Sequence, residues 1–182
     1  MADVPKIKMT KAEFMALPET NTPTELINGE LIVSPTPVDR HQEIVGLLHI
    51  LLHRLFHSGT LRLSPADVHI SEEDTVQPDL FWVSDASTTC VLADGKYWHG
   101  APDLVVEVLS PSTQKRDRGI KFDLYEQHGT REYWLIDPDN QTVEVYRRET
   151  DHLRRIGLFD QEQMFAFGLL PDVTIPVGEI FK

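Results

Sequence analysis

The stretch APDLVVEVLSPST, residues 101–113, indicates the fold of this chain. Its middle part, Leu104–Leu109, is nearly continuous in apolar and β-branched residues, as is typical of a central strand covered on both faces. Glu107 interrupts this run. A carboxylate inside such a strand is unfavourable unless it is paired or holds a metal ion. The stretch therefore predicts a buried strand, ended by Pro111, that carries one ion-paired or functional acid.

The flanking patterns predict a mixture of helices and strands. Thr10 and Glu13 fit a capping box at the start of a short helix, and Asn28-Gly29 indicates a hairpin within residues 24–33. Asp39 is a good N-cap for a long helix that should end near His57. Further strands are expected at residues 61–63, 68–70, 76–83, 132–136, 142–147, 153–159 and 173–175, a helix at 113–128, and a loop or short helix at 84–97.

This order of elements predicts an α/β (α+β) fold with a mixed central β-sheet flanked by helices. A length of 182 residues suits a single domain spanning 1–182. The chain has no apolar run near the roughly 18 residues that span a bilayer, no signal-peptide pattern, and one cysteine, Cys90, which cannot form an internal disulfide. A cytoplasmic protein with no membrane partner is expected.

The net charge of −12 argues against a nucleic-acid partner, because such proteins are usually basic on at least one face. Two local groups of cations weaken this objection. The first group is Lys115, Arg116, Arg118 and Lys121, and the second is Arg147, Arg148, Arg154 and Arg155. An ordinary solvated surface is the equally weighted alternative for both groups.

Two Pro-Asp pairs offer acidic partners for Glu107. Asp103 lies four residues away on the same strand, roughly 13 Å distant, too far to share one ion. Asp79 lies on another strand, and adjacent strands are about 4.8 Å apart, so it can converge with Glu107 on one ion. Hard oxygen ligands favour Mg²⁺ or Mn²⁺. The alternatives are a structural salt bridge from Glu107 to Lys121 or an arginine, and a strand-end turn role for Asp79.

The helix after this strand carries a candidate catalytic cation. Asp117, Lys121 and Tyr125 follow at intervals of four residues and share one stripe. Lys121 is predicted to polarise the nucleophile or to stabilise the charged transition state. A surface ion pair between Asp117 and Lys121 is the alternative. Glu25 is either a second acid near the metal or a strand residue, and His41 either contacts phosphate or metal or is a cap or surface residue.

Several segments together resemble a known family. They are ELINGEL from Glu25, QPDL from Gln77, APDLVVEVLSPST from Ala101, then Asp117, Lys121 and Tyr125, and EYWLIDP from Glu132. These motifs resemble those of the Uma-two family of restriction-endonuclease-like proteins. That family is part of the PD-(D/E)XK nuclease superfamily and was long labelled a domain of unknown function. The resemblance implies a restriction-endonuclease-like core, a metal-dependent nuclease and a homodimer. Leu109 stands where the superfamily pattern has lysine, which leaves Lys121 as the best replacement.

The leading functional hypothesis is an endonuclease that hydrolyses DNA phosphodiester bonds with a metal-activated water. Asp79 and Glu107 would bind the metal, and Lys121 would complete the catalytic set. A non-catalytic binding or assembly module with the nuclease fold is one alternative, favoured by Leu109 and by the acidic composition. A hydrolase of a small phosphorylated metabolite is another. A wide positive groove would favour the first hypothesis, a filled site the second and a narrow pocket the third.

Overall fold

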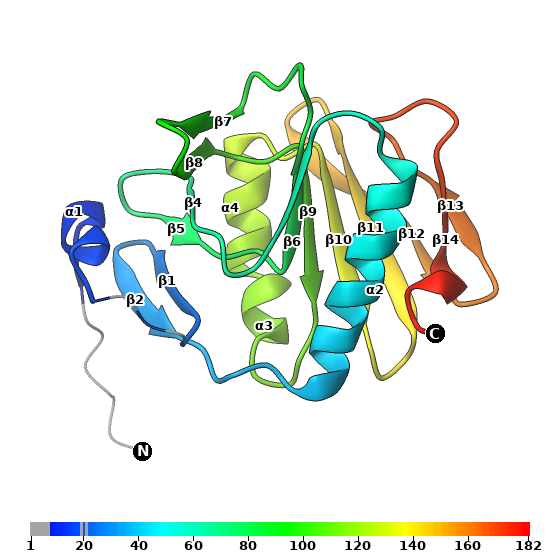
Figure 1. The fold of residues 1–182 in the computed structure, drawn as a ribbon, viewed down its shortest axis with the longest axis horizontal. Coiled ribbons are helices and arrows are strands. Elements are labelled where there is room, and N and C mark those ends of the chain that lie inside the picture. The colour runs from blue at the N-terminus through cyan, green and yellow to red at the C-terminus, as the bar shows by residue number, and fades with distance from the viewer. Residues whose placement is uncertain (1–7, 19, 21) are drawn as a thin grey trace.

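Two six-stranded sheets form most of the fold (Figure 1). The computed structural model describes residues 8–18, 20 and 22–182. The N-terminal sheet has the order β2 (Glu30–Val33), β1 (Thr24–Ile27), β5 (Thr75–Val76), β4 (Val68–His69), β8 (Tyr97–Gly100) and β7 (Cys90–Ala93). The central sheet has the order β12 (His152–Asp160), β11 (Thr142–Glu149), β10 (Glu132–Asp137), β9 (Leu104–Val108), β6 (Leu80–Val83) and β3 (Thr60–Leu63).

Helices and a short β-ribbon complete the described chain. The helices are α1 (Lys11–Met15), α2 (Asp39–Leu55), α3 (Gln114–Asp117), α4 (Ile120–His128) and the 3₁₀ turn η1 (Val177–Glu179), and the ribbon pairs β13 (Met164–Ala166) with β14 (Thr174–Pro176). The pairs β9–β10 and β4–β8 are parallel, while the other strand pairs are antiparallel. The predicted mixed sheet flanked by helices is therefore confirmed.

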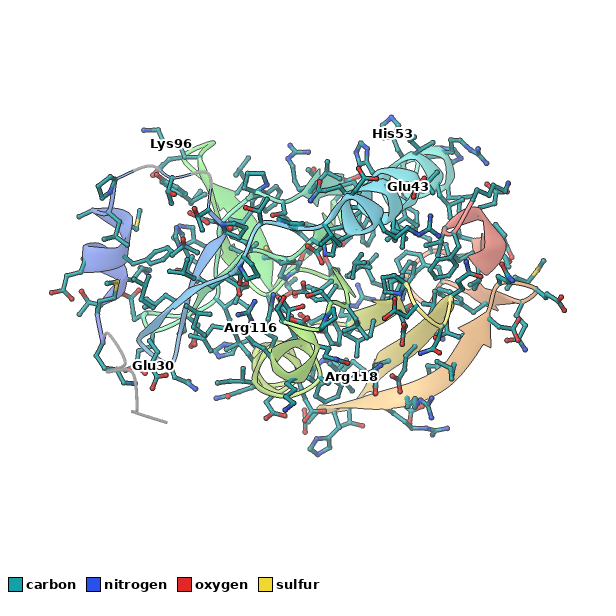
Figure 2. All side chains as sticks on the ribbon, turned by 90° about the horizontal axis from the view of Figure 1, so that it is seen from below. Glu30, Glu43, His53, Lys96, Arg116 and Arg118 are labelled. Carbon is teal, nitrogen blue, oxygen red and sulfur yellow. The ribbon has the colours of Figure 1, made fainter. Side chains whose placement is uncertain are left out.

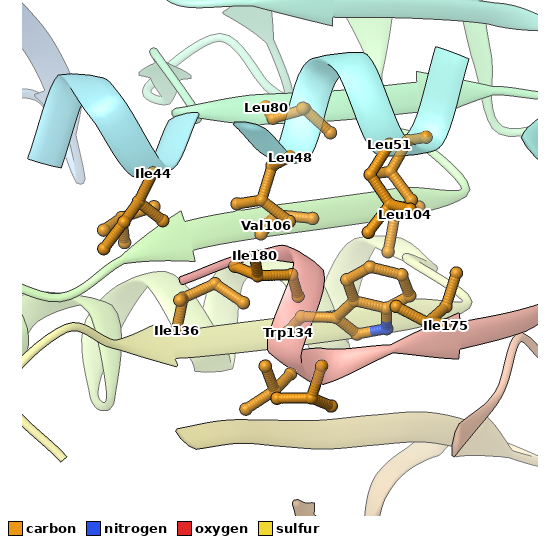
Figure 3. Packing of buried hydrophobic residues seen from close by; sticks show 14 of the residues in the cluster. Ile44, Leu48, Leu51, Leu80, Leu104, Val106, Trp134, Ile136, Ile175 and Ile180 are labelled. Carbon is orange, nitrogen blue, oxygen red and sulfur yellow. The ribbon is translucent and has the colours of Figure 1, made fainter. Parts of the chain in front are cut away.

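Strand alternation gives the central sheet two different apolar faces. One face, with Val106 and Trp134 at its centre, packs on α2 and on the C-terminal segment that contains η1 (Figure 3). The other face, with Val105 and Tyr133, packs on α4 and on residues of the N-terminal sheet. β9 is buried at every position, as its apolar run predicted. Glu107 shares the parity of Val105, so it lies on the face toward α4.

Two local predictions are confirmed. Thr10 and Glu13 form the capping box, with the Thr10 hydroxyl accepting from the Glu13 backbone and the Glu13 side chain accepting from the Thr10 backbone. Asn28 and Gly29 connect β1 to β2 with φ of 51° and 69°. These positive angles match the type I′ turn that an Asn-Gly pair favours.

Other local predictions were wrong. Residues 76–83 do not form one strand, because the chain leaves the N-terminal sheet after β5 and enters the central sheet at β6. Pro78 lies between them and has no N–H to give to a ladder. The helix expected at 113–128 is broken at Gly119, whose ψ of −104° is not helical. Asp39 is the first helical residue, and Val38 is the N-cap without a side-chain bond.

The segment 84–97, expected as a loop or short helix, instead contributes to a β-hairpin. β7 and β8 pair antiparallel around Asp94 and Gly95, whose φ values are 50° and 66°. Cys90, expected in the loop, is the buried first residue of β7. The ribbon strand β13 and the turn η1 had no counterpart in the sequence analysis. No helix within the described part of the chain has the length and apolar character needed to cross a membrane.

Candidate functional site

The candidate site lies where the two sheets meet, at the carboxyl end of β9. β6 and β9 are antiparallel, with Leu80 opposite Val106. One step further along this register brings Asp79 beside Glu107. The backbone N–H of Val108 donates to Asp79 Oδ2 at 2.8 Å. Asp79 and Glu107 line the same pocket, of about 270 Å³. The structure thus brings together the two residues that the sequence proposed as metal ligands.

Glu107 is held by two donors from α4. Its Oε1 forms an ion pair with Lys121 Nζ at 2.5 Å and accepts a hydrogen bond from the Tyr125 hydroxyl at 3.0 Å. Burial raises the pKa of Glu107 well above its ordinary value, against the lowering effect of Lys121, and three neighbouring carboxylates add to the rise. The structural ion pair weighed as an alternative does exist. It uses only one oxygen of Glu107.

Lys121 is a buried charge, not part of a surface ion pair. Its side chain is 2% exposed, and Nζ lies 3.0 Å from Glu25 Oε1 and 4.0 Å from Asp117 Oδ1. Burial alone would lower the Lys121 pKa, but Glu107, Glu25 and Asp117 together raise it well above the usual value. These carboxylates therefore favour the charged form of Lys121. Asp117 and Lys121, on either side of the break at Gly119, line the pocket with Glu107, and Tyr125 contacts Glu107.

Glu25 joins the site from the N-terminal sheet. It lies in β1, is 3% exposed, and its Oε1 also accepts from the backbone N–H of Gln77 at 2.9 Å. Of the two interpretations of Glu25, the acid beside the site fits the geometry, since Lys121 connects it to Glu107. Burial raises the pKa of Asp117, against Lys121 and the hydroxyl of Thr113.

His41 supports Asp79. It lies in the first turn of α2, is 8% exposed, and its Nε2 is 3.1 Å from Asp79 Oδ2. The interpretation of this histidine as a cap or surface residue was therefore wrong. Burial opposes the charged imidazole, but Asp79, the Val108 backbone and Asp117 together outweigh it, and the His41 pKa is raised. His41 and Val108 together fix one oxygen of Asp79.

Arg116 is the site residue that the sequence analysis placed only within a basic group. Its Nη2 donates to Ser34 Oγ at 2.8 Å and lies 3.4 Å from Glu25 Oε2. Ser34 lies 82 positions away in the chain, so no local signal could reveal the contact. Arg116 and Ser34 both line the pocket. The rejected candidate Asp103 is buried beyond the other end of β9, where it accepts from Ser84 N at 2.9 Å.

The predicted basic groups are largely ion-paired. Arg118 and Arg155 contact Glu144, Arg154 contacts Glu149, and Arg147 contacts Glu132. Neither group is therefore a continuous surface of unpaired cations. At the site itself, four carboxylates (Glu25, Asp79, Glu107 and Asp117) face two basic side chains, Lys121 and Arg116, with His41 beside Asp79. Such an excess of buried negative charge is unfavourable without a proton or a cation to offset it.

The donor set fits a hard divalent cation. Asp79 Oδ2 and Glu107 Oε1 are occupied by protein donors, whereas Asp79 Oδ1 and Glu107 Oε2 accept no hydrogen bond from the described residues. Within that same part of the chain, no three His, Cys, Asp or Glu side chains converge as a ligand group. Mg²⁺ is commonly held by only one or two carboxylates, with water and substrate phosphate completing its shell. Asp79 and Glu107 would hold the ion.

Two known proteins are similar to this chain, one in sequence and one in structure. An uncharacterized protein of Synechocystis sp. is 29% identical over 130 residues, which cover 70% of this chain and 67% of that protein. A crystal structure from Anabaena variabilis, described as a "putative nuclease belonging to DUF820", has the same fold. It superposes with a TM-score of 0.72 at 24% identity, covering 95% of this chain and 97% of that one.

The family model of Uma2, described as "Putative restriction endonuclease", matches residues 12–178. The match includes both sheets, the pocket and every residue of the candidate site. It agrees with the resemblance carried by the segments around Glu25, Asp79 and Glu107. The chain belongs to the Uma2 family of restriction-endonuclease-like proteins.

Proposed function

We propose that this protein is a metal-dependent endonuclease that hydrolyses phosphodiester bonds of DNA, with Asp79 and Glu107 as ligands of Mg²⁺ or Mn²⁺. One observation carries the proposal. Each of these carboxylates has one oxygen fixed by protein donors and one free of hydrogen bonds within the described residues, and both line one pocket. When bound, the ion would supply Lewis-acid activation of water and offset the charge of the phosphate.

The protein's own groups have distinct roles in this proposal. Lys121 is the catalytic cation, since neighbouring carboxylates raise its pKa and it contacts Glu107 directly. Leu109, at the position of the superfamily lysine, is 6% exposed and packs in an apolar cluster. Tyr125 orients Glu107, and His41 orients Asp79, by the hydrogen bonds described above.

A second candidate is a hydrolase of small phosphorylated compounds. The size of the pocket favours it, because a cavity of about 270 Å³ is near the lower limit for small-molecule sites. Glu107 and Lys121 are almost fully buried within it. Only one phosphate with its adjoining groups, and not a whole duplex, fits into such a space.

The test is a Mg²⁺ and Mn²⁺ titration with plasmid, single-stranded and duplex oligonucleotides, and p-nitrophenyl phosphate. Asp79→Ala and Glu107→Ala are compared with Asp123→Ala, a control that removes an exposed carboxylate of α4. The proposal expects metal-dependent strand cleavage that both site variants abolish and the control retains. Cleavage restricted to the phosphomonoester would favour the second candidate. Cleavage that is equal in all four proteins would contradict both.

Two metal sites are needed to cut both strands of a duplex, and a two-fold dimer would supply them. We therefore propose a homodimer, in agreement with the family resemblance. Light scattering at micromolar protein concentration tests it directly. A single mass equal to the 20.8 kDa monomer would contradict it.

A further inference from the structure

Arg116 has more hydrogen-bonding capacity than the protein uses. Its guanidinium carries five N–H groups, of which Nη2 donates to Ser34. The Nε atom is buried and has no hydrogen-bond partner within the described residues. Glu25 Oε2, 3.4 Å from Nη2, likewise has none. A buried donor left unpaired costs roughly 1–3 kcal/mol. Neutralising Glu25 alone does not account for this arrangement.

A group of hydroxyls lies beside Arg116 at the corner between β9 and α3. Ser110 Oγ is 3.0 Å from Ser112 Oγ and 3.0 Å from Thr113 Oγ1. All three residues line the same pocket as Arg116, Asp79 and Glu107. Within the described chain the hydroxyls of Ser110 and Ser112 bond to neighbouring hydroxyls or to nearby backbone, so they can turn to donate to an incoming anion. The Thr113 hydroxyl also bonds to the Asp117 carboxylate and would have to turn away from it.

We propose that Arg116 and the hydroxyls of Ser110, Ser112 and Thr113 form a subsite for a second phosphate of the substrate, the one next to the scissile phosphate. This inference rests on the proposed nuclease function and states how the substrate strand is held. The guanidinium presents a planar, forked set of donors that matches two phosphate oxygens. The subsite would also reduce the repulsion between the substrate's phosphates and the four carboxylates, because it places a cation beside them.

The position of Arg116 supports this assignment over its neighbour. Arg116 is 18% exposed and faces Ser34 and Glu25 in the N-terminal hairpin, whereas Arg118 is 41% exposed and contacts Glu144 in β11. Figure 2 shows the two arginines on different sides of the helical segment. Arg118 therefore serves as a matched control, with the same charge two positions away and outside the pocket.

The experiment pairs the arginine with single phosphates of the substrate. A single-stranded oligonucleotide is made as a series, each member with one neutral methylphosphonate at a different position, and is tested on wild type, Arg116→Gln and Arg118→Gln. We expect the wild type to lose about 10- to 100-fold in kcat/KM at one position next to the cut, the range for a charge-assisted hydrogen bond. Arg116→Gln should show that loss for the unmodified strand and none further at that position. Arg118→Gln should follow the wild type.

A merely structural role for Arg116 gives a different result. Arg116→Gln would then lower cleavage of every member alike and leave the methylphosphonate penalty unchanged, which would overturn the inference. Arg116→Lys keeps the charge but not the fork, and we expect a reduced penalty at the same position. If Arg116→Gln does not fold in a thermal melt, this second variant carries the test.

The binding of the same series, labelled with fluorescein and measured with Ca²⁺ by polarisation, separates this inference from the proposed function. A wild type that cleaves nothing yet binds with an Arg116-dependent loss at one phosphate would refute the nuclease and keep the subsite. If the wild type cleaves and no phosphate position depends on Arg116, the nuclease function is kept and the subsite is refuted. Absence of any oligonucleotide binding would overturn the subsite.

Discussion

Two buried glutamates on adjacent strands show how differently a fold can treat the same side chain. Glu132 begins β10 and is 0% exposed, while Glu107 lies in β9 and is 3% exposed. Glu132 Oε1 accepts from Trp134 Nε1 at 2.8 Å, and its Oε2 accepts from Arg147 Nε at 3.0 Å and Gly168 N at 2.9 Å. Both of its oxygens are used, and one cation balances its charge.

Glu107 has the opposite character. Only one of its oxygens is occupied, and it belongs to a group with more carboxylates than cations. Burial raises the pKa of both glutamates, but at Glu132 the donors are complete, whereas at Glu107 neighbouring carboxylates raise the pKa further. A buried acid therefore indicates a functional site when its surroundings are left incomplete, and a structural role when they are saturated.

The largest expected effect comes from breaking the saturated site. Glu132→Ala leaves the Trp134 indole N–H and the Gly168 N–H without their acceptor and removes the partner of Arg147. We expect a loss of about 3 kcal/mol in the free energy of unfolding, measured by urea denaturation. Mn²⁺ affinity, measured by calorimetry on the folded variant, should be unchanged. A stable Glu132→Ala protein, or one that has lost Mn²⁺ binding, would remove the distinction between the two glutamates.

Removing the charge of Lys121, beside the incompletely bonded Glu107, should lower the rate of the proposed cleavage reaction. Lys121→Met keeps a long stem but no charge, and turnover should fall by roughly 10²-fold, a loss of about 2.7 kcal/mol in transition-state stabilisation. Metal affinity should hardly change, because lysine is not a ligand. Single-turnover cleavage beside a Mn²⁺ titration provides the measurement. Lys115→Met, which alters an exposed lysine of α3, is the control. Full activity in Lys121→Met, or a loss confined to Lys115→Met, would show that another group is the cation.

The last effect, the smallest for each pH unit, is the dependence of stability on pH. Because the folded pKa of Glu107 is raised, the folded state holds a proton that the unfolded state loses above its ordinary pKa. Wild-type stability should therefore fall as pH rises toward the raised folded pKa, by at most about 1.4 kcal/mol per pH unit. Glu107→Gln cannot lose this proton, so its stability relative to wild type should increase with pH.

Urea denaturation of metal-free protein from pH 5 to pH 8 measures this difference. Asp123→Asn, which neutralises an exposed acid of α4, should follow the wild type across the range. A constant difference between Glu107→Gln and wild type would mean that Glu107 titrates as an ordinary acid. The comparison with Glu132 would then rest on geometry alone.

The sequence predicted those elements whose signals are local. The run around Val105 predicted β9, and Asn28-Gly29 predicted a hairpin, because each pattern depends only on neighbouring residues. Asp94-Gly95 is the same kind of turn signal, but its flanking strands β7 and β8 are short and partly polar, and the hairpin was missed. The split at Pro78 was missed because the apolar residues before Gln77 and after Asp79 were interpreted as one strand.

The candidate site was predicted in part for the same reason. Asp79, Glu107 and Lys121 were identifiable because each breaks a pattern or belongs to a motif with a known spacing. The partners of Glu25 were not, since Lys121 is 96 residues away in the chain and no periodicity connects them. Arg116 likewise acquires its role from Ser34 across the fold. Residues that complete a site from another sheet have no signal in their own segment.

The passage of the chain from one sheet to the other at Gln77–Asp79 has a mechanical consequence. Gln77 N–H holds Glu25 of the N-terminal sheet, and two residues later Asp79 is fixed to Val108 of the central sheet. A cation or phosphate bound in the pocket would thus link the two sheets. Binding of such a ligand should slow amide hydrogen exchange in β1 and β2, although neither strand carries a proposed metal ligand.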